Sequence, residues 1–189
     1  MKRIVLCFDG TWQSVDDPNS ISNVVRVAQA VLPVASDGVE QICYYQAGVG
    51  SDGGIDGILG GAFGVGLRNN VKRGLAFLSL NWDADEADEI YIFGFSRGAY
   101  TARAVAGVIG AVGGIPKQEH FDKLPEFWNY YRKDPKVRDA DQREKDRMRS
   151  LCFPERSDND ESPIITCLAV WDTVGSYGIP TGFGLSGLA

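Results

Sequence analysis

Continuous apolar runs that each end at a polar residue constrain the fold of this chain more than any other feature. They cover about Arg3–Phe8, Gln41–Tyr45, Ile90–Phe95 and Ile164–Trp171. Runs of this length are typical of strands that are buried on both faces, as in a parallel sheet. Segments with helical spacing lie between them, at about Asn23–Leu32, Leu67–Trp82 and Arg97–Ile109. The alternation predicts a three-layer α/β fold with a mostly parallel sheet.

Polar residues directly follow three of these runs, at Asp9, Ser96 and Asp172. The carboxyl ends of parallel strands meet at one edge of a sheet, and ligands of α/β proteins bind there. We therefore expect these three residues to share one site.

Ser96 lies in a pentapeptide, GFSRG at positions 94–98, that matches the G-x-S-x-G pattern. An apolar strand precedes it and a helix of small residues follows, which is the context that a nucleophile elbow requires. The serine's neighbours must be small because the turn is strained, and the helix N-terminus favours developing negative charge. We predict that Ser96 is a nucleophile and that the Arg97 N–H is one oxyanion donor. The alternative is a tight turn with a capping serine.

Asp172 is the candidate acid that would orient a histidine, with an N-cap or turn aspartate as the alternative. A backbone N–H of Gly10 or Thr11 is expected to supply the second oxyanion donor. Asp9 is expected to hold this loop by hydrogen bonding, and a turn-forming role for Asp9 is equally open.

His120 is the single histidine of the chain, and it lies between Ser96 and Asp172 in sequence. Its neighbours Glu119 and Asp122 are charged, so we expect a surface residue. In the order of an α/β-hydrolase site the histidine follows the acid. The base is therefore expected to lie outside this chain.

Four segments together carry a family resemblance: Val5–Trp12, Tyr44–Gly50, Gly94–Arg103 and Val170–Gly175. In this order they resemble the catalytic domain of type VI secretion phospholipase effectors, an α/β-hydrolase family. The resemblance implies a Ser-Asp-His site that hydrolyses carboxylic esters, phospholipids above all, with Ser96 as nucleophile and Asp172 as acid. It also implies an immunity or secretion partner, and export by a contact-dependent secretion system.

The 189 residues suit one domain. We expect a single α/β-hydrolase-like domain over 1–189, with a polar helical insertion at about 116–162. The family continues beyond this length and its histidine lies in the continuation, so the chain is expected to be the N-terminal part of a longer catalytic domain. A naturally short member is the alternative. The chain alone is expected to be nearly inactive, because losing one member of a triad costs orders of magnitude in rate.

Within the insertion, helical pieces are expected near Phe121–Arg132 and Asp139–Leu151. The aromatic tract Phe127–Arg132 is expected to pack on the domain, with a lipid-facing lid as the alternative.

The sequence leaves two other functions open, a binding or assembly module and a nucleotide-binding domain. A degenerate hydrolase that serves as a binding or assembly module is the main alternative. Gly48–Gly53 matches G-x-G-x-x-G, but no helix is expected to open at its third glycine, so a nucleotide-binding domain is a lesser alternative. No cluster has metal-ligand spacing, and neither a metal nor a cofactor is expected.

The net charge of −6 disfavours a broad phosphate-binding face. We expect a lipid or other ester substrate, no nucleic acid, and at most peripheral contact with a membrane. The four cysteines lack C-x-x-C spacing and are expected to be small buried thiols, which suggests a reducing compartment. The N-terminal apolar run is too short for a signal peptide, so synthesis in the cytoplasm is expected.

Overall fold

A sheet of four parallel strands forms the centre of the protein, in the order β2-β1-β3-β4. The structure is a computed structural model that describes residues 1–11, 13, 21–48, 62–83, 86, 88–153 and 164–174, with the backbone alone for 62–65. The strands are β1 (Lys2–Phe8), β2 (Glu40–Gln46), β3 (Glu89–Phe95) and β4 (Cys167–Trp171). The predicted α/β fold with a parallel sheet is confirmed.

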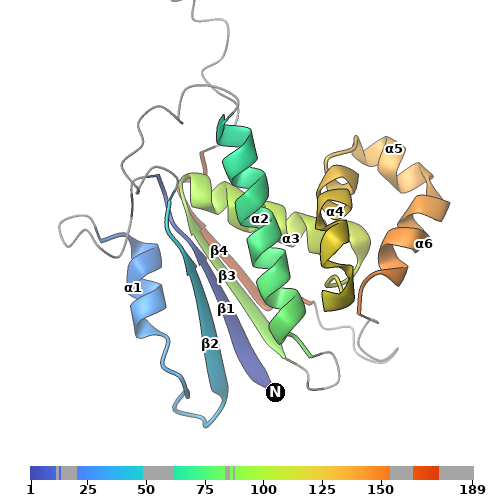
Figure 1. The fold of residues 1–189 in the computed structure, drawn as a ribbon. Coiled ribbons are helices and arrows are strands. Elements are labelled where there is room, and N and C mark those ends of the chain that lie inside the picture. Colours follow the sequence, from blue (N-terminus) through green and yellow to red (C-terminus); the bar gives the residue numbers. More distant parts are fainter. Residues whose placement is uncertain are drawn as a thin grey trace, which may run out of the picture.

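Helices cover both faces of the sheet (Figure 1). Helix α1 (Asn23–Ala30) packs with Val24 on one face, against Val5 and Cys7 of β1. Helices α2 (Ala62–Asn81) and α3 (Arg97–Val112) pack on the opposite face, where they form the larger core with alternate side chains of β1 and β3. The sheet thus lies between two helical layers.

The strand order creates a switch point between β1 and β3. From β1 the chain crosses through α1 to β2 on one side, and from β2 it returns through α2 to β3 on the other side of β1. The register pairs Phe8 with Gly94, so β1 and β3 end side by side. Ligands of open α/β sheets bind outside such a switch point. Asp9 and Ser96 follow these two strand ends.

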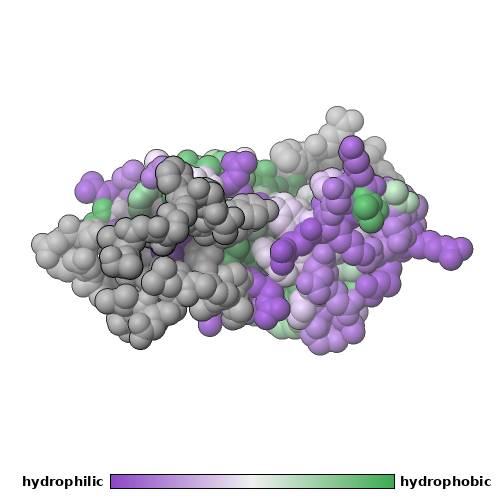
Figure 2. Space-filling view, turned by 90° about the horizontal axis from the view of Figure 1, so that it is seen from above, coloured by the Kyte–Doolittle hydropathy of each residue, from purple (hydrophilic) through white to green (hydrophobic). Residues whose placement is uncertain are grey.

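The polar segment after α3 contains a short 3₁₀ helix, η2 (Gln118–Lys123), and three further helices. These are α4 (Leu124–Tyr131), α5 (Pro135–Ala140) and α6 (Gln142–Ser150). Helix α4 packs against α2 and α3 and buries Phe127, Trp128 and Tyr130. The lid interpretation of this aromatic tract is therefore wrong. Seen from above, the part of the molecule formed by these helices is largely hydrophilic (Figure 2). The extent of the domain and of its insertion stays a prediction.

The starts of β4 and α2 differ from expectation. β4 begins at Cys167, three residues after the start of the apolar run at Ile164, because the ladder with β3 starts only at the pair Tyr91–Cys167. Helix α2 begins at Ala62 and continues through Gly64 and Gly66, where low helix propensity argued for a later start.

The four cysteines are free, but they are not uniformly buried. Cys7 and Cys152 are buried, Cys167 is intermediate, and Cys43 is exposed. The expectation of four buried thiols is wrong for Cys43, because β2 is the edge strand of the described sheet. Among the described helices, none combines the length and the apolar character needed to cross a bilayer.

Candidate active site

Ser96 occupies a strained turn between β3 and α3. Its backbone has φ 54° and ψ −119°, in the region that favours glycine. The Ser96 side chain makes no capping hydrogen bond to α3. This observation argues against the capping alternative, because a capping serine would accept a hydrogen bond from the first turn of its helix.

The two glycines of the elbow are required by close packing. A Cβ on Gly94 would lie 2.6 Å from Ala99 Cα and 2.7 Å from Gly98 O. A Cβ on Gly98 would lie 2.2 Å from Phe8 O. Any side chain at either position would push β3, α3 and β1 apart, so both glycines keep Ser96 at the strand ends.

Asp172 is brought beside Ser96 by two backbone hydrogen bonds. The Ser96 N–H donates to Trp171 O at 2.9 Å, and the Val174 N–H donates to Ser96 O at 3.3 Å. Asp172 lies between these two bonds, is exposed, and has a positive φ of 44°. Aspartate tolerates this conformation better than most residues. The predicted nucleophile and acid therefore belong to one turn-to-turn contact.

Asp9 is the buried polar centre of the neighbouring loop, with 3% of its surface exposed. Its Oδ1 accepts the Gly10 N–H at 2.8 Å. Its Oδ2 accepts hydroxyl donors from Ser22 at 2.8 Å and from Tyr45 at 2.7 Å. Asp9 thus holds the loop by hydrogen bonding, in a network that links β1, α1 and β2.

The same network bears on the choice between Gly10 and Thr11. Because the Gly10 N–H already donates to Asp9 Oδ1, the Thr11 N–H is the favoured candidate for the second oxyanion donor. No hydrogen bond within the described residues takes the Thr11 N–H, and Thr11 Oγ1 is buried without a partner there. The loop runs close to the nucleophile, since a Cβ on Gly10 would lie 3.3 Å from Ser96 Cβ.

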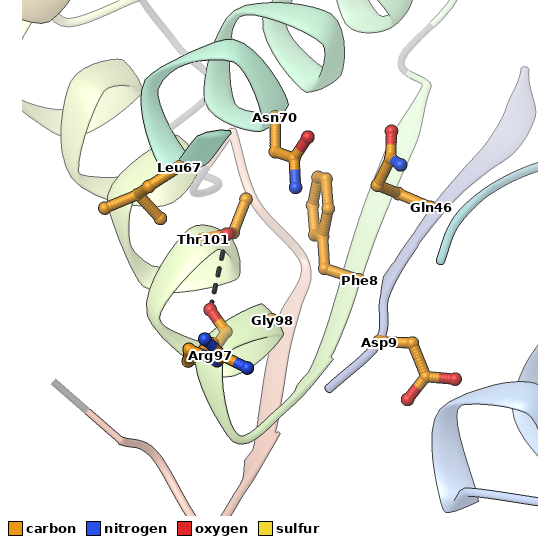
Figure 3. Close-up of a pocket in the computed structure, with 8 residues that line it drawn as sticks. All are labelled: Phe8, Asp9, Gln46, Leu67, Asn70, Arg97, Gly98 and Thr101. Atoms are coloured by element: carbon orange, nitrogen blue, oxygen red, sulfur yellow. Dashed lines mark hydrogen bonds between the residues drawn. The ribbon is translucent and has the colours of Figure 1, made fainter. Parts of the chain in front are cut away.

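The Arg97 N–H belongs to the first turn of α3, where backbone N–H groups point out of the helix end. Burial lowers the pKa of the Arg97 guanidinium. This side chain lines a small hollow beside the elbow (Figure 3), with the residues Phe8, Asp9, Gln46, Leu67, Asn70, Gly98 and Thr101. The hollow has a volume of about 10 Å³, which is space for one water molecule. In Figure 3 the Asp9 carboxylate turns toward α1.

His120 lies in η2, with 27% of its side chain exposed. Its Nε2 is 3.6 Å from Glu119 Oε1. Within the described residues no contact joins His120 to Ser96 or Asp172. The described residues therefore bring Ser96 and Asp172 into neighbouring turns but bring no histidine to them. No group of three metal-ligating side chains is found in the parts of the chain that the structure describes.

A comparison of sequences shows the family of the chain. The family model described as T6SS, phospholipase effector Tle1-like, catalytic domain matches residues 2–187. The chain belongs to this family. The Tle1-like match runs through all four motifs, from β1 to the segment after β4.

One curated relative extends the comparison beyond the family model. Uncharacterized protein YEL023C of Saccharomyces cerevisiae is 35% identical over 147 residues, which cover 70% of this chain and 20% of that protein. The chain therefore spans only a small part of this relative's length. No solved structure matches the chain.

Two residues of the site were missed in the sequence, namely Tyr45 and Ser22. Tyr45 lies in the Tyr44–Gly50 motif. The pattern of one strand does not show that its hydroxyl reaches the carboxylate after the neighbouring strand β1. Ser22 is the N-cap of α1, where it accepts the Val25 N–H at 3.1 Å, and a capping serine carries no signal of a second partner. Their convergence on Asp9 depends on strand order.

Proposed function

We propose that the protein is a serine hydrolase of carboxylic esters, with phospholipids as its substrates and Ser96 as its nucleophile. Ser96 Oγ attacks the ester carbonyl carbon while a histidine outside the 189 residues takes the hydroxyl proton. Asp172 orients that histidine. The oxyanion that forms accepts hydrogen bonds from the Arg97 and Thr11 N–H groups. Expulsion of the alcohol, which receives the proton, leaves an acyl-enzyme that water hydrolyses.

The observation that carries this proposal is the strained turn at Ser96, whose hydroxyl makes no capping hydrogen bond to α3. Backbone strain at a non-glycine residue persists where the surrounding structure holds it and is concentrated at functional sites. Here Gly94 and Gly98 permit the turn, and a capping role does not explain the serine. Membership of a phospholipase effector family supports esters of phospholipids as the substrate class.

The test is hydrolysis by the complete natural polypeptide that contains these residues. Phospholipid vesicles and p-nitrophenyl butyrate serve as substrates for the wild type and for Ser96→Ala. We expect Ser96→Ala to lower kcat at least about 10³-fold, because the nucleophile of a triad accounts for orders of magnitude in rate. A fluorophosphonate should label the wild type at Ser96 and leave the variant unlabelled.

Ser150→Ala is the matched control, since Ser150 is an exposed residue of α6 that bonds only Arg147 O among the described residues. It should keep full activity and labelling. Equal hydrolysis by the wild type and Ser96→Ala would overturn the nucleophile assignment.

A second candidate is a degenerate hydrolase retained as a binding or assembly module. The isolated position of His120 favours it, because no other histidine exists in the 189 residues. This candidate predicts that the complete polypeptide hydrolyses neither substrate and takes no fluorophosphonate label. Within the G-x-G-x-x-G match, Gly48 packs on the backbone of Gly10 and Thr11, which explains this glycine without a nucleotide. Residues 49–53 of the match lie outside the described residues.

We further propose that the complete protein is exported through a type VI secretion system and meets an immunity or secretion partner, as the family description suggests. The relative from Saccharomyces cerevisiae shows that matching sequence also occurs in a yeast protein.

A further inference from the structure

The carboxyl end of β2 contacts the loop at Gly10 and Thr11, although the proposed reaction uses no residue of β2. The Tyr45 hydroxyl donates to Asp9 Oδ2 at 2.7 Å across the β1–β2 pair. Through its Oδ1, Asp9 in turn accepts the Gly10 N–H at 2.8 Å. A chain of two hydrogen bonds therefore runs from Tyr45 to the residue before Thr11.

Packing restricts the loop from both sides. A Cβ on Gly48 would lie 1.6 Å from Gly10 O and 2.9 Å from Thr11 N. On the other side, a Cβ on Gly10 would lie 2.6 Å from the Phe95 ring. The Gly10–Thr11 peptide therefore fills the space between the end of β2 and the elbow. A shift of the β2 end cannot be absorbed without moving Thr11 relative to Ser96.

Such a shift matters because oxyanion donors act only at about 2.7–3.1 Å from the oxygen, and misplacement by about 1 Å can lower a rate about 10²-fold. Asp9 is buried, so its carboxylate depends on hydrogen-bond donors from the protein. Of the two hydroxyls on Oδ2, Ser22 caps α1, and Tyr45 is the one that comes from β2. The backbone also joins Asp9 to this strand, since the Asp9 N–H donates to Gln46 O at 2.9 Å, but only the Tyr45 bond reaches the carboxylate that holds the Gly10 N–H.

We propose that Tyr45 is a positioning residue, which acts through Asp9 to hold the Thr11 N–H where the oxyanion forms at Ser96. The inference rests on the proposed ester hydrolysis. Tyr45 touches neither the ester nor the reacting atoms in this proposal; its hydroxyl determines where the loop lies.

The test compares Tyr45→Phe with Tyr91→Phe in the complete polypeptide. Tyr91 is a matched control: it lies on the same face of the sheet, and its hydroxyl donates to a carboxylate, Glu89 Oε2, at 3.1 Å. Glu89 begins β3, at the end of the sheet opposite Ser96. We expect Tyr45→Phe to lower kcat for p-nitrophenyl butyrate about 10- to 100-fold with KM little changed, and Tyr91→Phe to change neither.

A second readout separates positioning from a general loss of structure. A phenylboronic acid forms a tetrahedral adduct on the serine, and its binding should weaken by the same factor as kcat/KM because it mimics the oxyanion. Urea unfolding of both variants measures their stability.

The outcomes distinguish this inference from the proposed function. If Ser96→Ala is inactive but Tyr45→Phe equals the wild type in kcat and boronate affinity, the positioning role is wrong and the ester hydrolysis stands. Equal losses in both tyrosine variants, in step with lost stability, would also reject it. If Ser96→Ala keeps full activity, the proposed function fails first and the inference fails with it.

Discussion

At the residue scale, the glycines of the elbow are explained by distance. Gly98 lies against the backbone of β1, where a Cβ would be 2.2 Å from Phe8 O and 2.5 Å from Asp9 O. Both neighbours are backbone atoms, one at the end of the central strand β1 and one in the residue after it, so they cannot move aside as a flexible side chain would. In contrast, a Cβ on Gly110 of the same helix would meet no atom within 4 Å.

This contrast gives a prediction of stability. Gly98→Ala should lower the free energy of unfolding by about 2–3 kcal/mol or more, because overpacking strains a close contact. Gly110→Ala should raise it by up to about 1 kcal/mol, because alanine is the better helix former and space is available. Urea-induced unfolding checks both. A neutral Gly98→Ala would mean that α3 and β1 do not approach as closely as described.

At the element scale, the start of α1 is tied to the active-site loop by one side chain. Ser22 Oγ accepts the Val25 N–H as the N-cap and donates its own proton to Asp9 Oδ2. The Asp134 cap of α5 is simpler, since it accepts the Lys136 N–H at an exposed site and has no buried side-chain partner among the described residues. Two helices of the same chain thus begin with caps of different burial.

Ser22→Ala should therefore destabilise the protein more than Asp134→Ala. We expect a loss of about 2–3 kcal/mol for Ser22→Ala, from the cap together with a donor to a buried carboxylate. Asp134→Ala should cost at most about 1 kcal/mol. Thermal and urea unfolding of both variants measures the difference. Equal losses would show that the bond between Ser22 and Asp9 contributes nothing to stability.

At the scale of the whole molecule, the helical layers and the strand order decide which thiols meet solvent. Burial raises the pKa of Cys152 to about 12. The pKa of Cys7 is also raised, by its side-chain interaction with Cys43 and then by burial, whereas the same interaction lowers the pKa of Cys43. A raised pKa means less thiolate at a given pH, and the thiolate is the reactive form.

Iodoacetamide at pH 8 should therefore modify Cys43 first in the folded protein. Cys7 and Cys152 should react only after unfolding in urea, because they combine burial with a raised pKa. Peptide mass spectrometry over a time course identifies the order, and Cys43→Ser should remove the fast phase. Native labelling of Cys7 at the rate of Cys43 would contradict the described cover of β1.

Periodicity and turn chemistry predicted the class of the fold and most of its elements. Arg3–Phe8, predicted as a buried strand, is β1 with one residue added, and the helix expected from Asn23 begins there. These signals are local, because apolar runs and caps act within a few residues. The start of β4 was missed because a strand begins where its pairing with a neighbour begins, here at Tyr91–Cys167, and not where apolar residues begin.

By itself, the sequence determined the parallel α/β class, the turn at Ser96 and the family, since each depends on short segments read in order. Tertiary structure alone decided how those segments meet. The order β2-β1-β3-β4 places Tyr45 within reach of Asp9, which accepts the Gly10 N–H and leaves the Thr11 N–H as the proposed oxyanion donor. Strand order and the contacts between side chains of neighbouring strands depend on residues far apart in the sequence. The local spacing of residues does not predict them.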